Sequence, residues 1–186
     1  MTLNKAVFLD RDGTIMFDSG YVSDPEKVDI FDETVEALKA LKEAGYLLVV
    51  VTNQSGIARG YFNMDELEKV NSRMCELFKE HGVLFDKIYV CPHRDEDRCT
   101  CRKPLPGLIF KAARELDIDV SVSFMIGNSR SDVHAGISAG CKLNFLIGAE
   151  KGSLSKDNTL SVGSVGDAAE IILTVDGTFD KMESQQ

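Results

Sequence analysis

The chain has 186 residues, of which 44% are hydrophobic, so it is long enough for one domain with a sizeable core. Its formal net charge of −9 argues against a nucleic-acid partner, because the mean field of an acidic protein repels a polyanion. The longest apolar run, residues 46–51, is too short to cross a bilayer, and the first residues lack the organisation of a signal peptide. We therefore expect a cytoplasmic protein without a membrane partner.

Five apolar runs alternate with helix-like stretches, which is typical of an α/β fold with a parallel sheet covered by helices on both faces. The expected strands cover residues 5–9, 46–52, 85–91, 123–127 and 142–147. The helices expected between them cover residues 33–44, 63–81, 106–116 and 131–140. The connections are short, so any cover over a substrate must come from loops, chiefly residues 11–31, 53–62 and 92–105.

The chain after the fifth expected strand is less clearly patterned. Residues 148–166 are rich in glycine, serine, asparagine and lysine and are expected to form a loop. A short helix over residues 167–173 and a frayed tail over residues 174–186 should follow. We therefore expect a single domain over residues 1–186, with its core within about residues 5–147.

Two carboxylates follow the first expected strand, where residues 7–15 read Val-Phe-Leu-Asp-Arg-Asp-Gly-Thr-Ile. Asp10 is the candidate nucleophile at the carboxyl end of this strand, where parallel sheets bind their ligands. Asp12 returns to the same side and is the candidate for exchanging protons with the leaving group and the attacking water. For this run alone, a strand followed by an ordinary Asp-Gly turn is the alternative.

Polar residues also follow the second expected strand, in the stretch Thr52-Asn53-Gln54-Ser55-Gly56-Ile57-Ala58-Arg59-Gly60. Hydroxyl and amide groups held at a strand end can bind phosphate oxygens through neutral hydrogen bonds. Arg59 can add a forked contact to a second anionic group. A glycine-containing turn with solvated polar side chains is the alternative.

Three cysteines and one histidine are clustered after the third expected strand. Three sulfur ligands and one imidazole suit tetrahedral zinc, and together they fill its coordination shell, so the metal should be structural. Chance clustering of buried cysteines is the alternative. The expected Zn²⁺ ligands are Cys91, His93, Cys99 and Cys101.

Arg102 and Lys103 come directly after this cluster. A loop held by a zinc ion can keep Arg102 and Lys103 in fixed positions. Lys103 can then neutralise a transferring phosphoryl group while Arg102 binds the substrate. Two neighbouring cations on a surface loop are the alternative. Local positive charge in an acidic protein suits a small phosphorylated ligand, and the basic residues of the polar loops are Arg11, Arg59, Arg102, Lys103 and Arg130.

A further polar segment follows the fourth expected strand, from Gly127 to Asp132. Its polar groups can complete a Mg²⁺ site with Asp10, because magnesium takes oxygen ligands. The alternative is a loop that starts a helix, with Asp132 near the cap position. The two interpretations are compatible.

In this order, Asp10-x-Asp12-Gly13-Thr14, Thr52, Lys103 and Gly127-x4-Asp132 resemble the four motifs of the haloacid dehalogenase superfamily of phosphatases. The zinc set followed by Arg102-Lys103-Pro104 resembles its zinc-containing branch of heptose bisphosphate and histidinol phosphatases. The resemblance implies a capless Rossmann-like fold, Mg²⁺ as the catalytic cofactor and a monomer. It also implies an aspartyl-phosphate on Asp10, acid and base catalysis by Asp12, and stabilisation of the phosphoryl group by Thr52 and Lys103.

The substrate loops distinguish the members of this branch. Residues 18–22 and the loop after the second expected strand resemble those of heptose enzymes, whereas the short zinc loop is closer in length to that of histidinol phosphatases. We give the substrate loops more weight because they should touch the sugar. The resemblance therefore implies removal of the 7-phosphate of a heptose bisphosphate, with histidinol phosphate or another sugar phosphate as the alternative substrate. The residues implied to bind substrate are Asp18, Ser19, Gly20, Tyr21, Asn53, Gln54, Ser55, Arg59, Arg102 and Ser129.

Asn128 departs from the superfamily pattern, in which the fourth motif usually begins Gly-Asp and this aspartate is a magnesium ligand. An asparagine keeps an oxygen donor but removes one negative charge. The Mg²⁺ site of Asp10, Asp12 and Asn128 should therefore bind its ion weakly and support slow turnover. A catalytically impaired protein that binds a phosphorylated metabolite is a further alternative, against which the intact pair of Asp10 and Asp12 argues.

Overall fold

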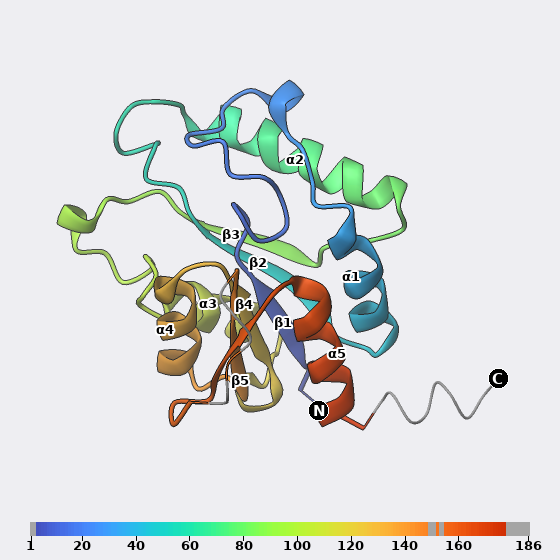
Figure 1. The fold of residues 1–186 in the computed structure, drawn as a ribbon. Coiled ribbons are helices and arrows are strands. Elements are labelled where there is room, and N and C mark those ends of the chain that lie inside the picture. The colour runs from blue at the N-terminus through green and yellow to red at the C-terminus, as the bar shows by residue number, and fades with distance from the viewer. Residues whose placement is uncertain (1–2, 149–151, 153–154, 178–186) are drawn as a thin grey trace.

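The computed structural model describes residues 3–148, 152 and 155–177, which form an α/β fold around one six-stranded sheet (Figure 1). The strands are β1 (Ala6–Leu9), β2 (Leu47–Asn53), β3 (Lys87–Cys91), β4 (Phe124–Gly127), β5 (Leu143–Ile147) and β6 (Thr159–Val162). They lie in the order β3-β2-β1-β4-β5-β6, and every neighbouring pair is parallel. The order reverses between β1 and β4, and in such sheets a ligand crevice lies beyond the carboxyl ends of the strands at this point.

Helices cover both faces of the sheet, as expected (Figure 1). One face carries α1 (Glu33–Glu43), α2 (Met64–Glu80) and α5 (Val165–Val175), and the other carries α3 (Gly107–Glu115) and α4 (Arg130–Ala139). The described residues also form three short 3-10 helices, η1 (Pro25–Lys27), η2 (Asp95–Asp97) and η3 (Val120–Val122). None of the helices that the structure describes is long and apolar enough to span a membrane.

The sequence of β1 explains its central place in the sheet. Val7 and Leu9 join the core beneath α1, α2 and α5, whereas Ala6 and Phe8 join the core beneath α3 and α4. All four side chains are fully buried, because successive residues of a strand face opposite sides and both sides of this strand are covered. The strand therefore holds the loop that begins at Asp10 on a rigid support.

Loops surround the carboxyl ends of the strands. The segment between β1 and α1 folds back on itself through an antiparallel bridge between Met16 and Ile30. Backbone N–H groups of Thr14, Ile15 and Met16 all donate to the carbonyl oxygen of Arg11, which makes the start of this loop compact. Within the described residues these loops take the place of an inserted cap domain, so the fold is capless as expected.

The prediction of a loop over residues 148–166 was wrong in part, because β6 lies within it and pairs with β5. This edge strand has only four residues and is half-buried over most of its length, so its apolar pattern is weak. Polar Thr159 and Ser161 alternate with its apolar residues. The sheet therefore extends one strand beyond the expected boundary.

The helix expected over residues 167–173 is the longer α5, whose N-cap is Ser164. Ala168 and Ile172 are fully buried and belong to the core shared with α1 and α2. The core therefore does not end at residue 147, as we had expected. Residues 174–177 of the predicted tail complete α5 and the turn after it, and residues 178–186 lie outside the described residues.

Candidate active site

A buried charge cluster lies beyond the carboxyl end of β1, with Lys103 at its centre. The Lys103 ammonium is 2.6 Å from Oδ1 of Asp10, 2.6 Å from Oδ1 of Asp132 and 2.6 Å from the carbonyl oxygen of Val51. An ammonium has three protons, so these three acceptors match its donors. Asp10 is only 8% exposed and Asp132 only 1%, so their charges interact with Lys103 with little screening by water.

Burial and the neighbouring charges determine how this cluster ionises. Burial is the largest cause that raises the pKa of Asp10 to about 6, while Lys103 opposes the shift and Asp132 adds to it. Burial also acts to lower the pKa of Lys103, but Asp10 and Asp132 outweigh it and the net direction is upward. At neutral pH Lys103 is charged and Asp10 is ionised, which is the form that a nucleophilic carboxylate needs.

Asp12 is held by a different set of donors. Arg11 donates to both carboxylate oxygens, from Nε to Oδ2 at 3.1 Å and from Nη2 to Oδ1 at 3.0 Å. Nε2 of Gln54 donates to Oδ2 at 2.7 Å, and Oγ1 of Thr52 lies 3.5 Å from the same oxygen. Arg11 is only 1% exposed and also bonds to Asn71, so it does not belong among the cations available to a ligand, where we had placed it.

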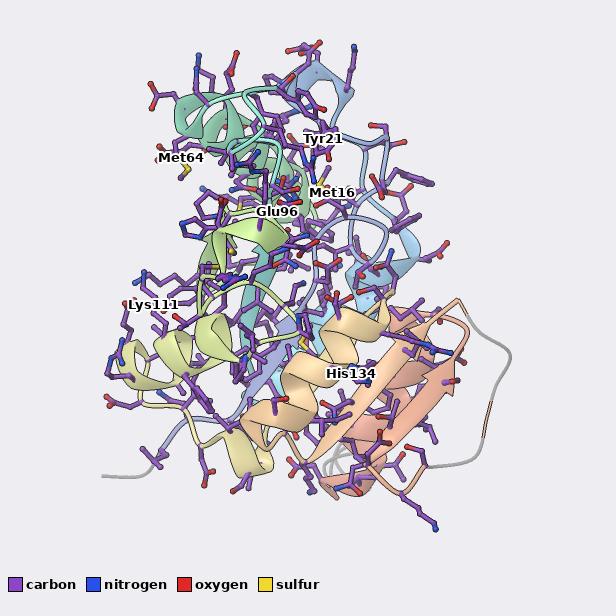
Figure 2. The ribbon with its side chains drawn as sticks, turned by 90° about the vertical axis from the view of Figure 1, so that its left-hand side faces the viewer. Met16, Tyr21, Met64, Glu96, Lys111 and His134 are labelled. Carbon is purple, nitrogen blue, oxygen red and sulfur yellow. The ribbon has the colours of Figure 1, made fainter. Side chains whose placement is uncertain are left out.

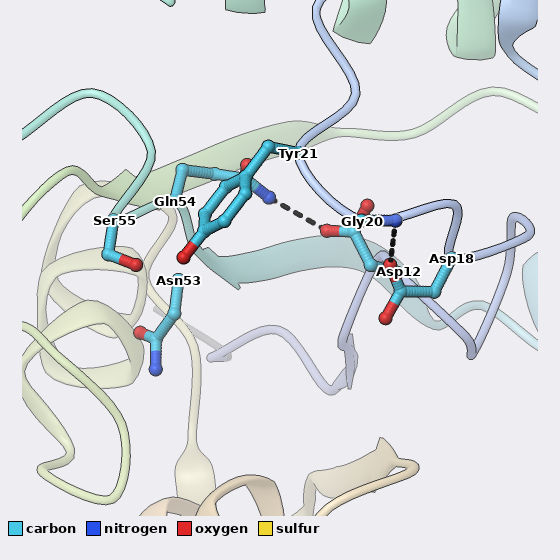
Figure 3. Close-up of a pocket in the computed structure, with 7 residues that line it drawn as sticks. All are labelled: Asp12, Asp18, Gly20, Tyr21, Asn53, Gln54 and Ser55. Atoms are coloured by element: carbon cyan, nitrogen blue, oxygen red, sulfur yellow. Dashed lines mark hydrogen bonds between the residues drawn. The ribbon is translucent and has the colours of Figure 1, made fainter. Parts of the chain in front are cut away.

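A pocket of about 230 Å³ opens beside Asp12, between the loop after β1 and the loop after β2 (Figure 3). The Tyr21 ring packs edge-on against Tyr61, with 4.6 Å between the ring centroids. Figure 2 shows Tyr21 and Glu96 toward the same end of the molecule, whereas His134 lies on α4 well below them. The lining includes most of the residues expected to bind substrate and consists of Asp12, Asp18, Gly20, Tyr21, Asn53, Gln54 and Ser55.

Four residues expected to bind substrate are not in this lining, namely Ser19, Arg59, Arg102 and Ser129. Ser19 and Arg59 are exposed on the two loops. Ser129 is the N-cap of α4, where its side chain accepts from the backbone N–H of Asp132 and its hydroxyl lies 2.6 Å from Oδ2 of the same residue. The structure thus gives Ser129 a structural contact next to the buried charge cluster.

Arg102 lines a second cavity of about 120 Å³, together with Lys103 and other residues of the zinc loop. Its Nε donates to Oδ1 of Asp95 at 2.5 Å, and its Nη1 donates to the carbonyl oxygen of His93 at 3.2 Å. The guanidinium is therefore paired within its own loop in this structure. A substrate bound by Arg102 would have to compete with Asp95 for it.

Asn53 connects β2 to the loop that carries Lys103. Its side-chain oxygen accepts from the backbone N–H of Lys103 at 3.0 Å, and its amide donates to the carbonyl oxygen of Lys103 at 3.0 Å. Two hydrogen bonds in opposite directions fix the position of one residue better than a single bond does. A residue that we expected to bind substrate thus also holds the backbone of Lys103.

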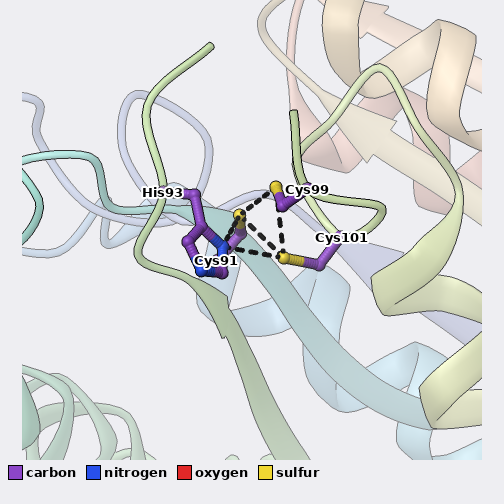
Figure 4. A group of neighbouring side chains, drawn as sticks. All are labelled: Cys91, His93, Cys99 and Cys101. Atoms are coloured by element: carbon purple, nitrogen blue, oxygen red, sulfur yellow. Dashed lines mark hydrogen bonds between the residues drawn. The ribbon is translucent and has the colours of Figure 1, made fainter. Parts of the chain in front are cut away.

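The four expected zinc ligands meet at one point (Figure 4), with all four donor atoms within 4.8 Å of one another. Cys101 Sγ lies 3.0 Å from Cys91 Sγ, 3.5 Å from Cys99 Sγ and 3.3 Å from Nδ1 of His93. Sulfur ligands of a tetrahedral zinc lie about 3.8 Å apart, given Zn–S bonds of about 2.3 Å. The cluster therefore fits a zinc ion after a small expansion.

The three thiols of the cluster differ in their ionisation, because burial raises the pKa of Cys91 and of Cys101, whereas that of Cys99 is lowered. Burial acts against the thiolate, but backbone donation from Arg102 and contacts with Cys101 and Cys91 outweigh it and lower the pKa of Cys99 to about 7. The thiolate is the form of cysteine that binds zinc.

Asn128 comes directly after β4, which is the neighbour of β1 in the sheet. Its amide lies against Gly13: a Cβ atom added to Gly13 would be 2.1 Å from Nδ2 of Asn128, so only glycine allows this approach. The oxygens of Asp10 and Asn128 are the hard donors that Mg²⁺ prefers. These residues fit the ion chemically, with one negative charge fewer than a pair of aspartates would supply.

Our reading of the sequence missed the contact that Asp132 makes in the active site. The sequence marked it as the end of the Gly127-x4-Asp132 motif and as a candidate helix cap, and Oδ2 does accept from the backbone N–H of Ser129 at 2.9 Å. The other oxygen, Oδ1, pairs with Lys103. The spacing Gly127-x4-Asp132 was the available signal, but no spacing in the sequence shows that Lys103 reaches this residue from another loop.

Comparisons with known proteins identify the family. The model of the family described as polynucleotide kinase 3 phosphatase matches residues 5–157. The D-glycero-β-D-manno-heptose-1,7-bisphosphate 7-phosphatase of Pasteurella multocida is 46% identical over 151 residues, and that of Helicobacter pylori is 48% identical over 148 residues. These regions cover 78% and 79% of this chain and 82% and 86% of those proteins. The chain belongs to the haloacid dehalogenase superfamily of phosphatases.

A solved structure of this superfamily is also similar. The D,D-heptose 1,7-bisphosphate phosphatase from B. bronchiseptica, complexed with magnesium and phosphate, matches with a TM-score of 0.82 and 32% identity. The match covers 91% of this chain and 98% of that chain. The fold, the phosphatase class and the resemblance to the heptose branch are thereby confirmed, and the roles of individual residues stay predictions.

Proposed function

We propose that this phosphatase removes the 7-phosphate of D-glycero-D-manno-heptose 1,7-bisphosphate. The observation that carries the proposal is the buried pair of Asp10 and Lys103 close to a pocket built from the two expected substrate loops. Relatives named for this activity align over more than three quarters of the chain, which supports the same substrate. From its sequence, we further propose that the protein acts as a monomer in the cytoplasm.

The reaction proceeds in two steps. Asp10 attacks the phosphorus in line with the leaving group, and Asp12 gives a proton to the sugar oxygen as the bond from that oxygen to phosphorus breaks. Water then attacks the phosphorus of the aspartyl-phosphate and gives a proton to Asp12, which frees Asp10. Thr52 and Lys103 stabilise the phosphoryl oxygens in both steps.

Two metal ions support this chemistry in the proposal. Asp10, Asp12 and Asn128 would hold Mg²⁺, which when bound supplies positive charge against the phosphoryl group. The cluster of Cys91, His93, Cys99 and Cys101 would hold a structural Zn²⁺ that fixes the loop carrying Lys103. Sugar recognition is assigned to Asp18, Ser19, Gly20, Tyr21, Asn53, Gln54, Ser55, Arg59, Arg102 and Ser129.

Phosphate release from both anomers of heptose bisphosphate and from histidinol phosphate, measured with Mg²⁺ present, tests the substrate. We expect the highest kcat/KM for one heptose bisphosphate anomer. The Asp10→Asn protein should stay folded, as judged by circular dichroism, and release no phosphate. A preference for histidinol phosphate would overturn the substrate, and a full rate for Asp10→Asn would overturn the nucleophile.

Asn128 supports a second candidate function, in which the protein binds a phosphorylated metabolite without hydrolysing it. The missing negative charge weakens the expected metal site, whereas the contacts assigned to sugar recognition do not involve Asn128. Binding of heptose bisphosphate without phosphate release in excess Mg²⁺ would support this candidate. Turnover at an ordinary rate would exclude it.

A further inference from the structure

Arg11 is one of the largest fully buried side chains of the described residues, at 1% exposure. A guanidinium keeps its charge in a protein, and burying a charge is costly unless it is paired and hydrogen-bonded. Arg11 meets this condition through a two-pronged ion pair with Asp12, the carboxylate assigned to proton transfer. Replacing a whole buried ion pair by apolar side chains is often neutral for stability, so stability alone is a weak explanation for this pair.

The third contact of Arg11 comes from a distant part of the chain. Its Nη1 donates to Oδ1 of Asn71 on α2 at 2.7 Å. The guanidinium is planar and its donors have a fixed geometry, so fixing one edge of the fork at Asn71 sets the direction of the edge that meets Asp12. Because the Arg11 carbonyl also accepts three backbone N–H groups of its loop, both ends of this residue are held.

The hydrogen bonds distinguish the two oxygens of Asp12. Oδ2 accepts from Arg11 Nε at 3.1 Å and from Gln54 Nε2 at 2.7 Å, and Thr52 Oγ1 lies 3.5 Å from it. Within the part of the chain that the structure describes, Oδ1 accepts one hydrogen bond, from Arg11 Nη2. One lone pair of Oδ1 is therefore left for a proton, so in this proposal Asp12 would meet Mg²⁺ through its main-chain carbonyl oxygen rather than through its carboxylate.

We propose that Arg11 and Asn71 are positioning residues that orient Asp12 so that Oδ1 exchanges protons with the reacting groups. The inference rests on the proposed phosphatase reaction. As the phosphorus forms its bond to Asp10 and loses its bond to the sugar oxygen, the proton on Oδ1 moves to that oxygen. When water later displaces Asp10 from phosphorus, one proton of the water returns to Oδ1, so the carboxyl group ends as it began.

The leaving group provides a measurement that separates positioning from folding. An alkoxide such as a sugar oxygen needs a proton as it leaves, whereas a nitrophenolate leaves without one. The value of kcat/KM covers the steps up to release of the leaving group, so it depends on proton donation for sugar phosphates and hardly at all for p-nitrophenyl phosphate.

The main variant is Asn71→Ala, which removes the acceptor for Arg11 without touching Asp12 and suits a helix. Ser72→Ala, at the next position of α2, is the matched control. We expect Asn71→Ala to lower kcat/KM for heptose bisphosphate about three- to tenfold through kcat, since one hydrogen bond to a charged group is involved. Its kcat/KM for p-nitrophenyl phosphate should stay within about twofold of the wild type.

Arg11→Lys keeps the positive charge but cannot make the paired hydrogen bonds of a guanidinium to Asp12. We expect it to lower kcat/KM for heptose bisphosphate about a hundredfold and to leave kcat/KM for p-nitrophenyl phosphate within about twofold of the wild type. If Arg11→Lys does not fold, the measurements on Asn71→Ala alone test the positioning role. The inference would be overturned if kcat/KM fell equally for heptose bisphosphate and p-nitrophenyl phosphate, or if Asn71→Ala did not lower kcat/KM for heptose bisphosphate. A wild-type protein that leaves heptose bisphosphate intact but cleaves histidinol phosphate would overturn the proposed substrate instead, and the comparison then uses histidinol phosphate.

Discussion

Asn128 is the residue at which this chain departs from the usual motif of its superfamily. Asn128→Asp adds one negative charge among the oxygen donors after β1 and β4, and hard cations are held largely by charge. We expect this substitution to tighten Mg²⁺ binding about tenfold and to raise kcat. A titration of phosphate release against Mg²⁺ measures both quantities.

Asn63→Asp is the control for this titration. It adds the same charge at the N-cap of α2, where aspartate caps a helix as well as asparagine does. Its Mg²⁺ curve should match that of the wild type. Identical curves for the wild type and Asn128→Asp would remove Asn128 from the metal site.

Asp132 offers a second test at the residue scale. Asp132→Asn keeps the size of the side chain but removes one of the two carboxylates that pair with the buried Lys103. We expect kcat to fall at least about tenfold and the free energy of unfolding to fall by about 1–3 kcal/mol, because a charged hydrogen bond is lost in a buried site. Urea denaturation and phosphate release measure the two effects.

Asp167→Asn is matched to this variant, because Asp167 holds the same capping-box position in α5. It should lower stability slightly and leave kcat unchanged. If Asp132→Asn behaves like Asp167→Asn, then Asp132 acts only as a helix cap and its contact with Lys103 has no catalytic consequence.

Local spacing decided which single residues could be predicted from the sequence. Asp10 and Asp12 follow a buried strand within one short motif, and the zinc ligands lie within eleven consecutive residues. The contact between Lys103 and Asp132, and the contact between Arg11 and Asn71, join residues that are far apart in the chain. Such pairs depend on how loops and helices pack, and a single sequence carries no spacing that reveals them.

The zinc loop is the element that places Lys103 in the active site. A Zn²⁺ ion held by the cluster of three cysteines and His93 would fix the loop on one side of Lys103, and the two hydrogen bonds of Asn53 hold its backbone. We expect Cys99→Ser to lose zinc, to lower the melting temperature by several degrees and to reduce kcat at least about tenfold, although the metal takes no part in the reaction.

Metal analysis, thermal unfolding and phosphate release measure these three effects. Cys75→Ser, a half-buried cysteine of α2 outside the cluster, should keep the zinc and most of the activity. A zinc-free Cys99→Ser protein with the full rate would show that the loop holds Lys103 in place without the metal.

Helices and strands with a clear capping or apolar sequence pattern were predicted well. The capping box of Asn63 and Glu66 marks the start of α2, and both of its hydrogen bonds are present. The strands β1, β2, β4 and β5 were found because central strands of a parallel sheet are continuously apolar. The strand β3 lies at one edge of the sheet, but its sequence Lys-Ile-Tyr-Val-Cys is still mostly apolar. The edge strand β6 is less apolar, and its place depends on pairing with β5, which the sequence pattern does not show.

At the scale of the whole molecule, β6 and α5 complete a scaffold that extends beyond the catalytic motifs. Ile172 of α5 is fully buried in the core shared with α1 and α2. We expect Ile172→Ala to reduce the free energy of unfolding by about 2–5 kcal/mol, because it leaves a cavity, and to leave kcat unchanged below the unfolding temperature.

Urea denaturation measures this loss, and Val175→Ala, at an exposed position of the same helix, should cost less than about 1 kcal/mol. A loss of kcat in folded Ile172→Ala would mean that α5 influences the active site as well as the core.

The covalent step at Asp10 tests the whole account most directly. We propose to mix the protein with heptose bisphosphate and Mg²⁺, stop the reaction with acid within one turnover and analyse the peptides by mass spectrometry. The account predicts a phosphorylated peptide whose phosphate is on Asp10, and no phosphorylated peptide from Asp10→Asn. Phosphate release by the wild type without phosphorylation of Asp10 at any reaction time would contradict it.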